Sequence, residues 1–383
     1  MLCAINHGQP DMVPVAPDIS GMLPTRAAGL PFWDSYLYNN PPGWLLYLEQ
    51  VKKFGLDGWF IYGGLGASKD DKREYRTEVR EKTHDKIVVR THCDTPDGTL
   101  WQERVYYRDN PEVIRTSNWV KDVDKDLPIY LKYFFPDPSS SDDADLQHQK
   151  SEIGDYGVMG CCIGYPEIGN FYIDVLDGTG YDGQRSTPGG LERAAYLYYD
   201  RHDLVKAYSK AYEKWAVEYT RQLVKARPDF LLLGTSGALV FNSPEIFRDL
   251  ALPTLQKQTR IAREAGVPTM LHSCGNQRAL VDICADETDL DCINPLEPPP
   301  GGDCDLAEVK QKFGDKLSLM GNLSTTLVSM GTSSDVREAA HKAIDAAKEG
   351  GGFILSTGDE CGPETPDDNI FAMVETARTY GRY

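Results

Sequence analysis

Residues 267–275 of this chain read Val267-Pro268-Thr269-Met270-Leu271-His272-Ser273-Cys274-Gly275. The first five form a short apolar run, which is typical of a parallel strand covered on both faces. Residues i and i+2 of an extended chain point to the same side, so His272 and Cys274 can reach one point. The stretch therefore predicts a buried strand with polar chemistry at its carboxyl end.

Seven further runs of this kind occur along the 383 residues. They are Val13–Pro17, Gly58–Tyr62, Gly157–Cys161, Phe230–Gly234, Leu290–Asn294, Leu317–Met320 and Phe353–Ser356. Helical segments lie between them, and Ser243-Pro244-Glu245 has the cap, first-turn proline and acid of a helix start. Strands that alternate with helices favour a (β/α)₈ TIM barrel. An open doubly wound sheet is less favoured because no glycine fingerprint follows an early strand. We expect residues 1–383 to form one domain.

The regular repeat is interrupted at about residues 69–150. There, Lys86–Cys93 and Leu100–Tyr107 alternate like the strands of a hairpin across Thr95-Pro96-Asp97-Gly98. We interpret this stretch as an insertion after the second barrel strand, containing a β-hairpin and loops. Two roles stay open for it: a lid over the barrel mouth, or an ornamental or subunit-contact insertion.

Composition excludes several kinds of partner. The chain has 58 acidic and 40 basic residues, a formal net charge of −18, which disfavours nucleic acid and anionic membranes as partners. No run approaches the ~18–20 apolar residues of a membrane helix, and the first residues do not resemble a signal peptide. Nine scattered cysteines in a chain of this size indicate a reducing compartment, so we expect a cytoplasmic protein.

A second strand end supplies another metal-binding residue type. The run Phe353–Ser356 leads through Thr357-Gly358-Asp359-Glu360 to Cys361, and the strand ends of a barrel meet at one mouth. One imidazole and two thiolates, from His272, Cys274 and Cys361, suit Zn²⁺ better than Mg²⁺ or Ca²⁺. Glu297, just after the sixth strand, is the candidate fourth ligand. The competing interpretation is that His-x-Cys is only structural here.

Three other residues are weaker candidates for catalysis. Asn322 follows the seventh strand and is either a substrate-orienting group or a turn former. Tyr165 and Glu167 follow the third strand. They are either an acid or substrate contact, or part of a rigid polar loop.

Several motifs resemble the uroporphyrinogen decarboxylase superfamily, mainly between residues 229 and 383. They are Asn242-Ser243-Pro244-Glu245-Ile246-Phe247, Leu271-His272-Ser273-Cys274-Gly275, Gly321-Asn322-Leu323, Gly351-Gly352-Phe353-Ile354-Leu355 and Thr365-Pro366-Asp367-Asp368-Asn369. Within this superfamily, His-x-Cys with a distant Cys is similar to the zinc-dependent corrinoid methyltransferases. The decarboxylases themselves use an Arg-rich segment near the amino terminus, whereas residues 19–26 contain only Arg26.

The resemblance implies an enzyme that moves a methyl group between a small molecule and a corrinoid carried by a partner protein. Zinc in that branch acts as a Lewis acid on the reacting heteroatom. Either a thiol accepts the methyl group, or an O-, N- or S-methyl compound donates it. The alternatives are a metal-free lyase of the decarboxylase type and a non-catalytic barrel subunit that binds a corrinoid protein. The aromatic run at residues 196–199 either packs a helix on the barrel or forms a homodimer interface.

Overall fold

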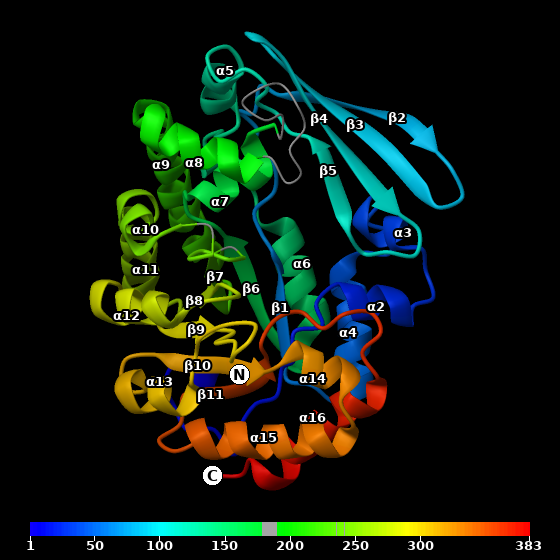
Figure 1. The fold of residues 1–383 in the computed structure, drawn as a ribbon, viewed down its shortest axis with the longest axis vertical. Coiled ribbons are helices and arrows are strands. Elements are labelled where there is room, and N and C mark those ends of the chain that lie inside the picture. The colour runs from blue at the N-terminus through cyan, green and yellow to red at the C-terminus, as the bar shows by residue number, and fades with distance from the viewer. Residues whose placement is uncertain (178–189, 235, 241) are drawn as a thin grey trace.

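Seven parallel strands form one curved sheet in the order β1-β6-β7-β8-β9-β10-β11 (Figure 1). In this computed structural model, residues 1–177, 190–234, 236–240 and 242–383 are described. The strands are β1 (Gly58–Gly63), β6 (Gly157–Ile163), β7 (Phe230–Gly234), β8 (Thr269–His272), β9 (Cys292–Asn294), β10 (Ser318–Leu323) and β11 (Phe353–Thr357). The sheet has the α/β architecture expected of a TIM barrel, and each strand coincides with a run predicted from the sequence.

The remaining predicted strand, Val13–Pro17, which is the first along the chain, is reduced to a single bridge. Val15 pairs in parallel with Leu355 of β11, and the Ala16 amide donates to the Leu355 carbonyl at 2.9 Å. On its other side, the Asp57 amide donates to the Val15 carbonyl at 3.0 Å. The segment therefore lies between β11 and β1, where an eighth strand belongs. Pro14 and Pro17 have no N–H to donate, which prevents a longer ladder.

Apolar side chains fill the interior of the curved sheet. This interior cluster consists of Ala16, Trp59, Val158, Phe230, Leu232, Met270, Cys292, Met320 and Ile354, together with Ala4 and Ile5 of α1 (Leu2–Ile5). Its members come from the segment 13–16 and from all seven strands. A methyl group added at Gly160 would overlap the Phe230 ring, so the glycine makes room for that ring. The interior is thus a packed core rather than a pore, which confines ligand binding to the strand ends.

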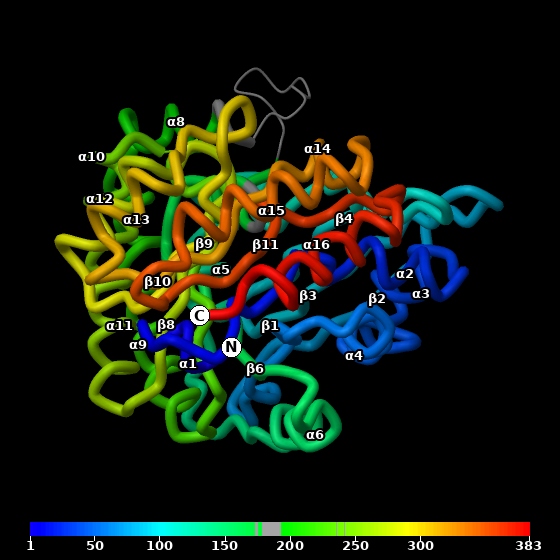
Figure 2. The backbone as a smooth tube through the Cα atoms, turned by 90° about the horizontal axis from the view of Figure 1, so that it is seen from below, coloured from blue at the N-terminus to red at the C-terminus, as the bar shows by residue number. Residues whose placement is uncertain are grey.

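Helices cover the outer face of the sheet, and a larger apolar cluster lies between the two layers. In Figure 2, α15 and α16 run side by side along one flank. The α-helices are α2 (Met22–Ala27), α3 (Phe32–Tyr36), α4 (Gly43–Phe54), α5 (Asp126–Tyr133), α6 (Ala144–Ile153), α7 (Ile168–Asn170), α8 (Gly190–Asp200), α9 (His202–Ala226), α10 (Pro244–Leu250), α11 (Leu252–Ala265), α12 (Arg278–Glu287), α13 (Leu306–Phe313), α14 (Thr325–Met330), α15 (Ser333–Ala347) and α16 (Asp367–Tyr380). Short turns are η1 (Pro138–Ser140), η2 (Gly154–Tyr156) and the wider η3 (Phe171–Val175).

The predicted insertion contains a second sheet, antiparallel and four-stranded, in the order β2-β3-β4-β5. The predicted hairpin is confirmed as β3 (Lys86–Thr95) and β4 (Gly98–Tyr107), and β2 (Glu74–Lys82) and β5 (Val113–Ser117) extend it on both sides. Figure 1 shows this sheet standing away from the barrel strands, with β2 outermost. Leu100 and Cys93 of the sheet join a separate apolar cluster with residues of α5, α8 and α9.

The two ends of the chain lie side by side (Figure 2). Met12 and Arg382 form an antiparallel bridge, and the Tyr383 amide donates to the Asp11 carbonyl at 3.4 Å. Within the described ranges, every helix is too short or too polar to cross a bilayer.

Aspartates placed just before three of the strands bind the amide of a neighbouring strand. Asp57 accepts from the Val15 amide, Asp229 from the Met159 amide and Asp291 from the Thr269 amide, each at 2.8 Å. Asp291 also accepts from the Thr269 hydroxyl at 2.9 Å. These carboxylates satisfy backbone donors at the amino-terminal edge of the sheet, where a ladder partner is missing.

Replacing Asp291 by alanine is therefore expected to lower the free energy of unfolding by about 1.5–3 kcal/mol, because two charge-assisted bonds to a buried threonine are lost. Urea unfolding measures the change. The matched control is Asp286→Ala, which removes only an exposed pair with Lys316 and should alter stability little. Equal losses in the two variants would contradict a structural role for Asp291.

Candidate metal centre

The candidate site joins two strands that are not neighbours in the sheet. His272 is the last residue of β8, and Cys274 lies two positions further in the loop to α12. Asp359 lies two residues after β11. One donor atom from each of the three residues lies within 4.8 Å of the others. Because β9 and β10 separate β8 from β11 in the sheet, its curvature is what brings these donors together.

The donor set fits a zinc ion. An imidazole nitrogen, a thiol sulfur and a carboxylate oxygen are the three ligand types that zinc takes in proteins. The Nδ1 atom of His272 is buried and has no hydrogen-bond partner among the described residues. A buried polar atom without a partner costs free energy, and a bound cation would supply the partner. Three protein donors also leave one position of a tetrahedral site for substrate.

Acidic side chains surround the three donors, and burial opposes their ionisation. Burial, reinforced by the Asp359 carboxylate, raises the pKa of the Cys274 thiol to about 11. Burial, followed by the charge of Asp18, raises the pKa of Glu360 to about 7. Burial also raises the pKa of Asp18 and of Glu297 above their ordinary values. Crowded, partly desolvated acids of this kind favour a bound cation, which would stabilise the thiolate and the carboxylates together.

Cys361, a ligand predicted from the sequence, lies in the same loop as Asp359 but is not one of the three converging donors. Its side chain is buried, and its amide donates to the Asp18 carbonyl at 2.8 Å. Burial, together with the Asp18 carboxylate, raises the pKa of the Cys361 thiol to about 12. The loop after β11 thus offers two candidates for the third ligand, and zinc coordination by Cys361 stays a prediction.

Glu297, the predicted fourth ligand, lies beside the three donors. Its Oε2 atom accepts a hydrogen bond from the Gly275 amide at 2.5 Å. A Cβ atom at Gly358 would lie 3.0 Å from the Glu297 Cγ atom. The glutamate therefore fills the space between the loop that carries Cys274 and the loop that carries Asp359. Its role as a zinc ligand stays a prediction.

Two of the three predicted catalytic residues, Asn322 and Tyr165, lie at different distances from the candidate site. Asn322, in β10, donates from Nδ2 to the Leu296 carbonyl at 3.0 Å, next to Glu297. Tyr165 is fully buried, its ring packs edge-on against Phe247 with centroids 5.6 Å apart, and burial raises its pKa well above the usual value. Asn322 is thus close to the candidate site, whereas Tyr165 belongs to the core beneath α10.

Glu167 is buried and connects to the site through a chain of hydrogen bonds. Its Oε2 atom accepts from Asn242 Nδ2 at 2.9 Å, and the same amide group donates to the Ala238 carbonyl at 2.6 Å. The Ala238 amide in turn donates to the Ser273 hydroxyl at 3.0 Å. Ser273 lies between His272 and Cys274, so this chain of bonds positions the segment that carries these two candidate donors. A catalytic role for Glu167 stays a prediction.

Two residues at the candidate site, Asp359 and Asn242, do not stand out in the sequence. In the sequence, Asp359 is only part of the segment that leads to Cys361, although a carboxylate two residues after a barrel strand is itself a candidate ligand. In the sequence, Asn242 is only part of a family motif, and its position depends on a hydrogen bond to Glu167, which is far away in the chain.

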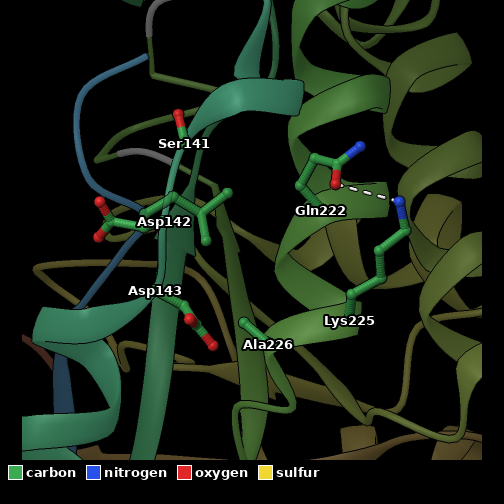
Figure 3. A pocket seen from close by; sticks show the side chains of 7 residues that line it. Ser141, Asp142, Asp143, Gln222, Lys225 and Ala226 are labelled. Carbon is green, nitrogen blue, oxygen red and sulfur yellow. Dashed lines mark hydrogen bonds between the residues drawn. The ribbon is translucent and has the colours of Figure 1, made fainter. Parts of the chain in front are cut away.

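A hollow on the outer side of the protein does not contain the candidate donors (Figure 3). It is lined by Leu65, Ser141, Asp142, Asp143, Gln222, Lys225 and Ala226. Lys225 donates to Gln222 at 3.1 Å, as the dashed line in Figure 3 marks. Since its charged groups bond within the protein, this hollow is a weaker candidate for a functional site than the strand ends.

The fold and the site together define a parallel α/β barrel with a group of side chains that could hold a metal ion at its carboxyl-terminal strand ends, where barrels of this kind carry their chemistry. The chain belongs to the uroporphyrinogen decarboxylase (URO-D) family, whose pattern matches residues 185–380. This match includes His272, Cys274, Asp359 and Cys361.

Two kinds of curated protein are similar to the chain. The chain is 30% identical over 166 residues to a methylcobamide:CoM methyltransferase, MtaA, of Methanosarcina barkeri, covering 43% of this chain and 46% of that protein. It is 22% identical over 207 residues to the uroporphyrinogen decarboxylase of Coxiella burnetii, covering 52% and 53%. The chain therefore matches about half the length of these curated relatives.

One solved structure shares the fold over nearly the whole chain. A methyltransferase from Methanosarcina mazei superposes with a TM-score of 0.61, covering 99% of this chain and 97% of that one, at 17% identity. At this identity, the likeness establishes the fold alone.

Proposed function

We propose that the protein is a zinc-dependent methyltransferase that moves a methyl group between a small molecule and a corrinoid bound to a partner protein. The observation that carries this proposal is the convergence of His272, Cys274 and Asp359 within 4.8 Å at the strand ends. The names of the methyltransferase relatives support it, since those proteins act on methylcobamide and CoM.

His272 and Cys274 would hold the zinc ion, with a third donor from the loop after β11, either Asp359 or Cys361. When bound, zinc supplies Lewis acidity to the heteroatom that gives or receives the methyl group. Glu297 is the candidate for an additional ligand, because it already lies between the two metal-binding loops.

The loop after β11 is anchored from outside the site. Glu360 Oε1 accepts from the Gly21 and Met22 amides, each at 2.8 Å, at the start of α2. The Asp18 amide donates to the Thr357 hydroxyl at 2.9 Å. A loop held in this way keeps the third ligand in place before metal binds, and such preorganisation lowers the cost of assembling the site.

Substrate would enter at the open face beside Cys274. A Cβ atom at Gly275 would lie 2.6 Å from Val240 Cγ2, and Val240 is 55% exposed. An exposed valine next to the donors offers apolar contact to a substrate or to the corrinoid protein, and Asn322 offers a nearby amide group for orientation. Both assignments follow from position at the strand ends.

The lyase alternative lacks its expected anion-binding group. Arg26, the only arginine of residues 19–26, already pairs with Asp367 at 3.1 Å. A tetrapyrrole carboxylate would therefore compete with an internal partner for this guanidinium. The methyltransferase proposal needs no such exchange.

The test is methyl transfer by the zinc-loaded protein in both directions under anaerobic conditions. One assay gives methylcobalamin and a panel of thiols including CoM, and the other gives Co(I) cobalamin and O-, N- or S-methyl compounds. We expect one direction to exceed the protein-free rate, with the same zinc concentration, at least about a hundredfold. The corrinoid spectrum and mass spectrometry of the methylated product measure the rate. No transfer in either direction with zinc bound, together with CO₂ release from uroporphyrinogen, would favour the lyase.

A further inference from the structure

The outer edge of the antiparallel sheet is open. All nine residues of β2 (Glu74–Lys82) are exposed, and β3 is its only paired neighbour among the described strands. In Figure 1, β2 lies at the outer margin of the sheet, away from the barrel. An edge of this length presents unpaired N–H and C=O groups to any strand that matches it.

The sequence of β2 is complementary to itself when read in the opposite direction. If Thr77 faces Thr77 of a second antiparallel copy, Arg76 faces Glu78, Tyr75 faces Val79, and Glu74 faces Arg80. Each of these pairs occurs twice because of the two-fold symmetry. Residues directly opposite each other in an antiparallel pair interact through their side chains, and opposite charges stabilise the pair.

Neighbouring registers lose this complementarity. A shift by one residue in one direction places Glu74 opposite Glu81, and a shift in the other direction places Arg73 opposite Arg80. Moving the two-fold axis to Glu78 places Glu78 opposite itself and Arg76 opposite Arg80. Like charges directly opposite each other are destabilising, so the charge pattern selects the register centred on Thr77.

The same register covers exposed apolar surface. Alternate residues of a strand share a face, so Tyr75, Thr77 and Val79 lie on one side of the sheet. The Tyr75 and Val79 side chains are 50% and 52% exposed. Tyr75 of one copy would contact Val79 of the other copy across the new strand pair, and the reverse contact follows from the two-fold symmetry. Aromatic and β-branched side chains form favourable cross-strand pairs of this kind.

The contacts within one chain leave this pairing accessible. Arg76 pairs with Asp94 at 2.6 Å and Arg80 with Glu78 at 2.7 Å, but both pairs are exposed and therefore contribute little stability. A bulge in the β2–β3 ladder lies between Val79 and Glu81. The central residues Tyr75–Val79 thus carry most of the fit, and the Glu74–Arg80 pairs lie at its margins.

We propose that β2 pairs with β2 of a second copy of this chain, antiparallel and centred on Thr77, to give a continuous eight-stranded sheet across a two-fold axis. Charged edge strands commonly prevent association. Here the alternating charges repel strands that lack the complementary pattern, whereas a second antiparallel copy of β2 places opposite charges against each other. Repulsion of the wrong partners therefore makes the pairing selective.

The first experiment is a charge exchange in the full-length protein, read by analytical ultracentrifugation over a range of concentrations. Arg76→Glu and Glu78→Arg each place like charges opposite each other twice, so each should raise the dimer dissociation constant about tenfold or more. The double variant, Arg76→Glu with Glu78→Arg, restores opposite charges and should restore dimerisation. Glu112→Arg, an exposed site just before β5, is the control of equal charge change and should leave the dimer intact.

A second measurement does not depend on charge. Thr77→Cys should be joined between copies by a short bifunctional thiol reagent, because the two Cβ atoms would lie about 4.5–5.5 Å apart, whereas Glu112→Cys should not. A wild-type protein that stays monomeric at every concentration would overturn the proposal. So would a dimer that responds equally to the single, double and control variants.

Discussion

Replacing Cys274 by alanine is expected to prevent zinc binding and to abolish the proposed methyl transfer. The thiol is one of three donors that converge within 4.8 Å, and its removal leaves two of them. Loss of a residue that binds the zinc directly should weaken zinc binding by more than the ~10–100-fold caused by loss of a residue that only hydrogen-bonds to a ligand. Elemental mass spectrometry after dialysis measures zinc per chain, and the corrinoid assay measures the rate.

Cys3→Ala is the matched control, since Cys3 is an exposed cysteine distant in sequence from the site. It should retain about one zinc per chain and the wild-type rate. If Cys274→Ala kept its zinc while remaining folded, the proposed centre would be wrong. If it lost zinc but kept methyl transfer, the metal would be structural rather than catalytic.

The third ligand is tested in the same way. Cys361→Ala is expected to lose zinc because zinc favours thiolate, and Asp359→Asn reports separately whether the carboxylate contributes. Zinc retained in Cys361→Ala but lost in Asp359→Asn would assign the third position to Asp359, the residue that the structure brings together with His272 and Cys274.

The second large effect concerns stability. Phe230→Ala is expected to lower the free energy of unfolding by about 3–5 kcal/mol, since it empties a fully buried position in the barrel interior. Gly160 leaves space for the Phe230 ring, so the neighbouring strand cannot fill the cavity with a side chain of its own. Urea unfolding measures the loss.

Phe371→Ala is the control, because Phe371 lies on α16 and is 43% exposed. Its loss should be clearly smaller, since much of its ring already contacts water. Equal losses of unfolding free energy in the two variants would mean that neighbouring residues move into the space left by the Phe230 ring. The interior would then be a deformable core.

Sequence patterns alone located the seven strands of the parallel sheet. Runs such as Phe230–Gly234 and Phe353–Ser356 are apolar throughout because both faces of a parallel strand are covered, a local signal that needs no knowledge of neighbours. The i, i+2 spacing of His272 and Cys274 likewise placed two donors on one side of an extended segment. Ser243 caps α10 as its sequence indicated, with its hydroxyl accepting from the Ile246 amide at 3.3 Å.

Other features depended on residues far apart in the chain. The strand β2 was not predicted, although Tyr75, Thr77 and Val79 alternate with charged residues. Every residue in it is exposed, so this alternation does not mark a buried face. The segment Val13–Pro17 forms only one bridge to β11. A longer ladder would need backbone N–H donors at Pro14 and Pro17, and proline has none.

Sequence by itself thus determined the barrel strands, the inserted hairpin and the pair His272 and Cys274, because each is specified by spacing within a few residues. Only the tertiary structure brought Asp359 next to that pair, across two intervening strands. It also connected Glu167 through Asn242 and Ala238 to the segment that carries His272 and Cys274. The physical reason is that sheet curvature and side-chain packing set distances between strand ends, and no local periodicity encodes those distances.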